Sequence, residues 1–113
     1  DWRQQMSAAH GRIEAGICGF VTRVTATSED QQHVRFQVES TCETITALGS
    51  ALPEVDAYAE LGSGFDGELW STIRSGLKGC CSGCVVPSGL FKAMQIAAGV
   101  ALPRAAGMEF EKL

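Results

Sequence analysis

Two alternating runs flank a polar turn in the stretch FVTRVTATSEDQQHVRFQVE, residues 20–39. In each run every second residue suits a buried sheet face, and the residues between them are mostly polar. The inward-facing residues are Phe20, Thr22, Val24 and Ala26 in the first run and Val34, Phe36 and Val38 in the second. The polar residues 28–32 predict a turn. We therefore expect strands over 13–27 and 34–39 to form an antiparallel hairpin with one face toward water.

Helical spacing dominates the chain after this hairpin. Apolar residues recur at the i, i+3, i+4 positions across 88–101, which predicts a helix with one buried face and Ser88 as its N-cap. The same spacing predicts shorter helices over 45–52 and 68–77, and a short one over 54–61. Ser40 or Thr41 is the expected N-cap of the first of these.

The last residues, 108–113, alternate apolar and charged side chains and predict a third strand beside the hairpin. The expected fold class is therefore α+β: a small antiparallel sheet, made of the N-terminal hairpin plus the C-terminal strand, covered on one face by three to four helices. We expect residues 1–11 to be a disordered or vector-derived tail. A single domain is expected over 12–113, because this length is usual for one domain.

Composition narrows the classes of function. Apolar residues make up 45% of the chain and charged residues 19%, which is typical of a globular protein. The net charge of −4 disfavours nucleic acid as a partner, because phosphate binding needs clustered Lys and Arg. The sequence contains no apolar run of the roughly 20 residues that a membrane helix needs, and no signal segment. We expect a cytoplasmic protein that does not bind membranes.

Five cysteines carry the candidate chemistry. Cys81 and Cys84 have the Cys-x-x-Cys spacing that lets two sulfurs reach one ion, while Cys18 lies between two glycines and Cys42 at a predicted strand-to-helix junction. An odd number of cysteines is unusual in a secreted disulfide framework and typical of thiols in a reducing cytosol. We predict that Cys18, Cys42, Cys81 and Cys84 bind a metal, with Cys80 as the alternative ligand. Four thiolates suit zinc or an iron–sulfur cluster, and the spacing does not separate the two.

Two other interpretations of the cysteines remain open. Cys81 and Cys84 could form a redox pair whose thiolate is stabilised by the N-terminus of the following helix, although residues 85–87 intervene. Alternatively, the cysteines pack as small apolar residues in a protein-interaction module. His10 and His33 are expected to be solvated rather than ligands. The sequence contains no Ser–His–Asp pattern, phosphate loop or zinc-protease motif, so an enzyme is not indicated. A protein partner or a homo-oligomer is expected.

The motifs GICGFVT at 16–22, STC at 40–42, CSGCVVP at 81–87 and AGVALP at 98–103 together resemble a family of small uncharacterised proteins. This family is a domain of unknown function found mainly in anaerobic bacteria and archaea, and the resemblance covers about residues 12–113. It implies no activity.

The cysteines that match this family are Cys18, Cys42 and Cys84. The resemblance implies that histidine often stands at the position of Cys81 in relatives. A metal site tolerates that exchange because both residues are ligands, whereas a dithiol pair would not survive it. The anaerobic setting favours an oxygen-sensitive iron–sulfur cluster over zinc, with a role in electron transfer or as an accessory to a redox system.

Overall fold

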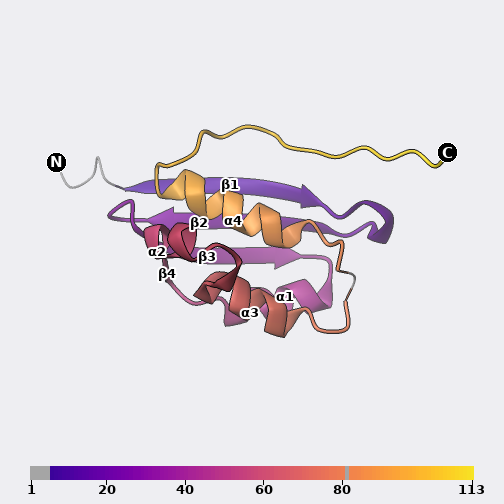
Figure 1. The fold of residues 1–113 in the computed structure, drawn as a ribbon, viewed down its shortest axis with the longest axis horizontal. Helices are drawn as coiled ribbons and strands as arrows, with labels where there is room; N and C mark the ends of the chain where they lie inside the picture. Colours follow the sequence, from indigo (N-terminus) through magenta and orange to yellow (C-terminus); the bar gives the residue numbers. More distant parts are fainter. Residues whose placement is uncertain (1–5, 81) are drawn as a thin grey trace.

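Three strands that follow one another in the sequence form an antiparallel meander, and a two-residue strand completes the sheet (Figure 1). The computed structural model describes residues 6–80 and 82–113. The strands are β1 (Ser7–Glu14), β2 (Val21–Ser28), β3 (His33–Ser40) and β4 (Val55–Asp56), in the spatial order β1-β2-β3-β4. Helices pack against this sheet, so the predicted α+β class is confirmed.

The residues that alternate in the hairpin sequence also alternate between buried and exposed positions in the sheet. Val24 pairs with Val38 and Ala26 with Phe36, and both β2 residues are fully buried on the face that carries the helices. Arg23 lies on the opposite face and is exposed. Because successive side chains of a strand point to opposite faces, one face of the sheet is covered and the other is polar and solvated.

Within residues 6–80 and 82–113, four α-helices and two 3₁₀ turns connect and cover the strands. Their bounds are η2 (Gly16–Cys18), α1 (Glu43–Ala51), α2 (Ala57–Ser63), η3 (Gly64–Asp66), α3 (Glu68–Gly76) and α4 (Val86–Ala97). The longest helix, α4, packs on β1 and β2, while α1 packs on β3 and α3 packs against α1 and α4. Leu48, Leu69, Leu90 and Met94 from three of these helices meet in the core between helices and sheet.

The helices approach the sheet closely at two glycines. A Cβ atom on Gly49 of α1 would lie 2.6 Å from Cβ of Val38, and one on Gly89 of α4 would lie 2.3 Å from Cδ1 of Ile13. Real Cβ atoms do not come this near to other carbon atoms, so Gly49 is required for this spacing, whereas at Gly89 the nearest atom is the flexible end of the Ile13 side chain.

The predicted C-terminal strand is wrong. Residues 98–113 follow α4 without regular structure, and residues 102–113 are exposed along their whole length (Figure 1). The short β4 lies instead at the edge of the sheet beside β3. An alternating pattern shows that a segment can pair, but pairing also needs a strand edge beside it, and residues 108–113 do not pair with the outer strand β1.

Residues Ser7 to Gly11, which the sequence analysis includes in a disordered or vector-derived tail, are ordered in strand β1. The core face of β1 is formed by Ala9, Gly11 and Ile13, of which two are too small to stand out as apolar in the sequence. Residues 1–5 lie outside the described part of the chain.

Element boundaries differ from the prediction where glycines and caps decide them. The strand predicted over 13–27 is divided, because Gly16 and Gly19 adopt φ values of 80° and 74° and turn the chain through η2. Cys42, rather than Ser40 or Thr41, is the N-cap of α1, and α4 begins at Val86, before Ser88. No helix among the described residues is long and apolar enough to cross a membrane.

Candidate functional site

Three cysteine-bearing segments lie at the same end of the molecule (Figure 1). Cys18 is in the loop that joins β1 to β2, and Cys42 follows β3. Both are at this end because β1 and β3 run in the same direction and each terminates there. Cys80 and Cys84 are in the connection from α3 to α4, which passes the same end of the sheet.

Cys18 ends the 3₁₀ turn η2 and is exposed. The turn is closed by two backbone hydrogen bonds, from Gly19 N–H to the Gly16 carbonyl at 2.9 Å and from Ala15 N–H to the Phe20 carbonyl at 3.1 Å. The glycines on either side supply the positive φ values that reverse the chain. The thiol is therefore carried on a tight loop at the tip of the hairpin.

Cys42 is held by hydrogen bonds at the start of α1. Its N–H donates to Oγ of Ser40 at 3.0 Å, and its carbonyl accepts from both the N–H and the hydroxyl of Thr46, at 3.0 and 3.1 Å. The Ser40 hydroxyl is also 2.8 Å from that of Thr22 on β2, which ties this junction to the sheet. Cys42 is half-buried against the core, so its backbone is the most firmly fixed of the cysteine positions.

The connection from α3 to α4 holds Cys80 and Cys84. Cys80 is exposed, and its N–H donates to the Leu77 carbonyl at 3.0 Å as the chain leaves α3. Cys84 is half-buried, packs against the core and stands two residues before the first residue of α4. Cys81, the other member of the Cys-x-x-Cys pair, lies outside the described residues.

The thiols of this end act on one another electrostatically. Burial is the main cause that raises the pKa of the Cys84 thiol, and a hydrogen bond from the Val86 N–H partly offsets it. Negative charge on Cys18, Cys42 and Cys80 raises this pKa further. The placement of their segments at one end of the sheet, rather than this pKa, is what groups the four thiols. We call Cys18, Cys42, Cys80 and Cys84 the cysteine cluster.

The cysteine cluster is not a closed ligand sphere. Within residues 6–80 and 82–113, no three His, Cys, Asp or Glu side chains are close enough together to hold a metal ion. The structure thus brings three of the four predicted ligands, Cys18, Cys42 and Cys84, to one end of the molecule without joining them. It places Cys80, the alternative ligand, with them.

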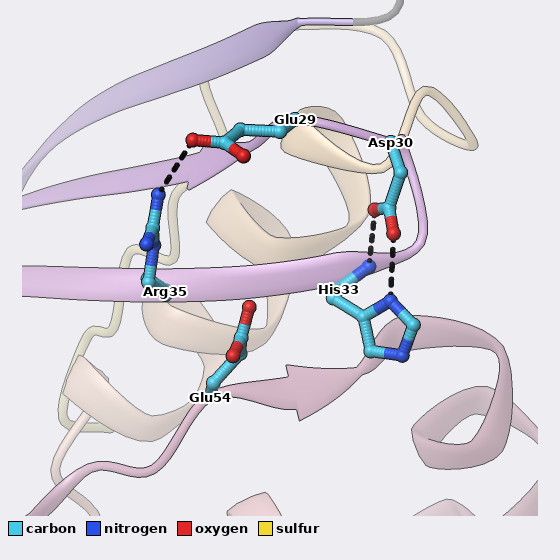
Figure 2. A pocket seen from close by; sticks show the side chains of 5 residues that line it. All are labelled: Glu29, Asp30, His33, Arg35 and Glu54. Carbon is cyan, nitrogen blue, oxygen red and sulfur yellow. Dashed lines mark hydrogen bonds and ion pairs between the residues drawn. The ribbon is translucent and has the colours of Figure 1, made fainter.

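A second group of polar side chains lies at the opposite end of the sheet, where β2 turns into β3. It forms a small hollow of about 280 Å³ lined by Glu29, Asp30, His33, Arg35 and Glu54 (Figure 2). Arg35 donates to Glu29 at 3.2 Å, and the Nδ1 atom of His33 lies 2.7 Å from Oδ2 of Asp30. His33, which the sequence predicts to be solvated, is exposed and pairs with Asp30.

Asp30 organises this turn through one carboxylate. Its Oδ1 accepts from the N–H groups of Gln32 and His33, at 2.9 and 2.8 Å, while Oδ2 faces the His33 ring (Figure 2). These bonds hold the pKa of Asp30 well below its usual range, and the bond to Asp30 raises the pKa of His33. The signal that could have predicted the pair is the spacing Asp-x-x-His in a turn, because an Asp side chain there bonds the backbone two and three residues on.

Comparison with known proteins places the chain in a family. Residues 9–110 match the family of unknown function DUF6951. The chain belongs to this family. The matched residues include both ends of the sheet and all five cysteine positions. The match confirms that the chain belongs to a family of unknown function, as expected from the sequence. Neither the curated proteins nor the solved structures include a match to this chain.

Proposed function

We propose that this protein binds a thiolate-preferring metal centre at the cysteine cluster. The ligands are Cys18, Cys42, Cys84 and either Cys80 or Cys81. An iron–sulfur cluster is the first candidate and zinc the second, because both accept four cysteine ligands. The observation that carries the proposal is the convergence of three separate segments, each bearing a thiol, on one end of the sheet.

Local structure supports a site that closes when the metal binds. Cys42 is fixed at the start of a helix, whereas Cys18 and Cys80 are exposed on loops that can approach it. Like charges oppose the gathering of several thiolates without a cation, and a metal ion removes that repulsion. Metal binding would therefore require the loops that carry Cys18 and Cys80 to move toward Cys42.

The surroundings of the cysteine cluster suit a protein that passes electrons to a partner. Ile17, next to Cys18, is fully exposed, and Phe20 on the same loop is 42% exposed. Exposed apolar side chains around a redox centre provide a contact surface for another protein. An anaerobic origin, as the family resemblance implies, would protect an oxygen-sensitive cluster. We therefore propose a cytoplasmic role in electron transfer or as an accessory to a larger redox system.

The alternative of a thiol redox pair is less well supported. A nucleophilic cysteine needs a lowered pKa so that the thiolate forms near neutral pH. Burial instead raises the pKa of Cys84, the described member of the pair. A metal ion changes this balance, because coordination favours the deprotonated sulfur even where burial opposes it.

Anaerobic purification followed by an absorption spectrum and metal analysis tests the metal proposal. We expect about one bound centre per chain, and replacement of Cys18, Cys42 or Cys84 by serine should lower its occupancy at least about tenfold. Cys80→Ser and Cys81→Ser identify the fourth ligand, since only one of them should have this effect. Ser82→Ala in the same loop is the matched control and should keep the centre. Iron and zinc both below about a tenth of an equivalent, before and after reconstitution, would refute the proposal.

A further inference from the structure

Residues 102–113, which follow α4 after the buried Ala98, are exposed along their whole length. Phe110 is 88% exposed and Met108 is 66% exposed, although both lie in an alternating run of the kind that forms strands. Large apolar side chains held open along one face of an extended segment indicate a surface that is normally covered.

The same chain has an open strand edge. β1 is the outer strand of the sheet and pairs with β2 alone among the described strands. The N–H of Thr41 donates to the Val21 carbonyl at 3.1 Å, so the backbone of Val21 faces β3 rather than its partner Glu14 on β1. Hydrogen-bonding direction alternates along an antiparallel pair, so Glu14, Arg12, His10 and Ala8 direct their N–H and C=O groups away from the sheet.

In the observed arrangement, residues 108–113 do not form backbone hydrogen bonds with the open edge of β1 in the same chain. It leaves α4 near the start of β1 and runs along the molecule until its end lies beyond the loop that joins β1 to β2 (Figure 1). The alternating run is the last part of this segment, residues 108–113. It has therefore passed the end of the edge with which it would pair.

The two faces of the open edge match the two faces of the run. On the polar face Arg12 of β1 lies directly opposite Arg23 of β2 and forms an ion pair with Glu14 of its own strand, so this face already carries charges of both signs. In the run 108–113, Glu109 and Glu111 share one face, while Met108 and Phe110 share the other. A strand added to β1 would place the two carboxylates beside Arg12 on the polar face of the sheet. The apolar pair would then lie on the face where Ile13 contacts Gly89 of α4.

We propose that residues 108–113 of one copy pair with β1 of a second copy, and that the second copy returns the same contact. Exchange of identical segments gives a closed, twofold-symmetric dimer in which both open edges are covered. The added strand supplies backbone hydrogen bonds to the edge, and Phe110 and Met108 become buried against the partner. This inference does not depend on metal binding, because the edge and the segment are both distinct from the cysteine cluster.

Sedimentation velocity of the whole chain in reducing buffer, with and without bound metal, tests the exchange. The wild-type chain should be a dimer at tens of micromolar concentration. Phe110→Asp should weaken the dimer at least about 30-fold, because it places a charge at a buried aromatic anchor. Leu102→Asp is the matched control: this residue is 79% exposed and precedes the alternating run, so the variant should stay dimeric.

A mixing experiment separates strand exchange from other modes of dimerisation. Arg12→Pro removes an outward N–H from the edge but leaves the exposed segment intact, and Phe110→Asp does the reverse. Each variant alone should be monomeric, whereas a mixture should form heterodimers through the one intact edge and the one intact segment. Arg12→Glu, which repels the acidic run, replaces Arg12→Pro if circular dichroism shows that the proline variant is unfolded.

Three results would overturn the proposal. The first is a wild-type chain that is monomeric at about 100 µM. The segment would then be free, pair with β1 of its own chain or bind a different protein. A Phe110→Asp chain that remains as dimeric as the wild type would show that another surface joins the copies. Variants that fail to complement each other on mixing, while both are folded, would exclude the exchange itself.

Discussion

At the residue scale, Asp30 shows how one side chain can organise a turn that joins two strands. Its carboxylate accepts two backbone N–H groups and pairs with the His33 ring, all within four residues. The carboxylates of Asp56 and Glu54 also favour the protonated ring. Because every group is near the surface, the pair tunes the stability of the turn with pH rather than forming a rigid buried contact.

The pH dependence of this pair follows from the two pKa shifts. The raised pKa of His33 gives stability that is complete below its ordinary value of 6.5 and is lost as pH rises through the folded-state pKa. The lowered pKa of Asp30 gives stability that is complete above its ordinary value of 3.8 and is lost as pH falls through its folded-state pKa. The pair should therefore stabilise the protein most between about pH 4 and 6.5.

Urea unfolding of the wild type and His33→Asn across pH 4 to 9 measures this effect. The difference in unfolding free energy should be largest below about pH 6.5 and should shrink as pH rises. His10→Asn is the control, because His10 lies near the Thr25 hydroxyl rather than a carboxylate. A difference that grows toward pH 9 would contradict the assigned direction of the His33 shift.

At the element scale, the sequence predicted the hairpin and the long helix because their apolar periodicity is what packing requires. Val24 and Ala26 alternate with exposed residues, and Leu90, Ala93 and Met94 share one buried helical face. The close contact between α1 and β3 could not be predicted in this way. The contact depends on Gly49 packing against Val38, and the sequence around either residue does not indicate which residue it will contact.

Buried polar contacts between elements escape periodicity for the same reason. Glu60 of α2 is 3% exposed, and its Oε1 accepts from the Leu69 N–H at the start of α3. In the sequence Glu60 is one more charged residue in a short helix. The candidate ligands could be picked out from the sequence, since cysteines are few and stand out by type. Their separation in the fold depends on loop geometry that spacing does not reveal.

Gly49→Ala tests the close approach of α1 to β3. Alanine would favour the helix by about 1 kcal/mol, but its Cβ would lie 2.6 Å from Cβ of Val38. Overpacking of this kind costs about 1–3 kcal/mol, so we expect net destabilisation of about 1–2 kcal/mol in urea unfolding. Gly62→Ala in α2 is the control and should be neutral or stabilising, because no neighbouring atom lies within 4 Å of its Cβ position. Equal effects of the two substitutions would contradict the packing argument.

At the scale of the whole molecule, the two ends of the sheet and the exposed segment form separate regions. The cysteine cluster occupies the end where β1 and β3 terminate, and the Asp30–His33 turn occupies the other. Residues 102–113 contribute almost no buried surface to the single chain that carries them. If these residues are exchanged between copies, the stability that they provide depends on protein concentration.

Thermal unfolding as a function of protein concentration measures that contribution. If the segment is exchanged, the unfolding temperature of the wild type should rise by about 3 °C for each tenfold increase in concentration, because folding and association are then linked. The unfolding temperature of Phe110→Asp should not change with concentration and should equal the wild-type value extrapolated to high dilution. The equality follows because the residue makes no buried contact in the single chain, where its side chain is 88% exposed. A Phe110→Asp chain that is less stable than the wild type even at high dilution would place Phe110 in a contact within its own molecule, and would assign the segment to folding rather than to association.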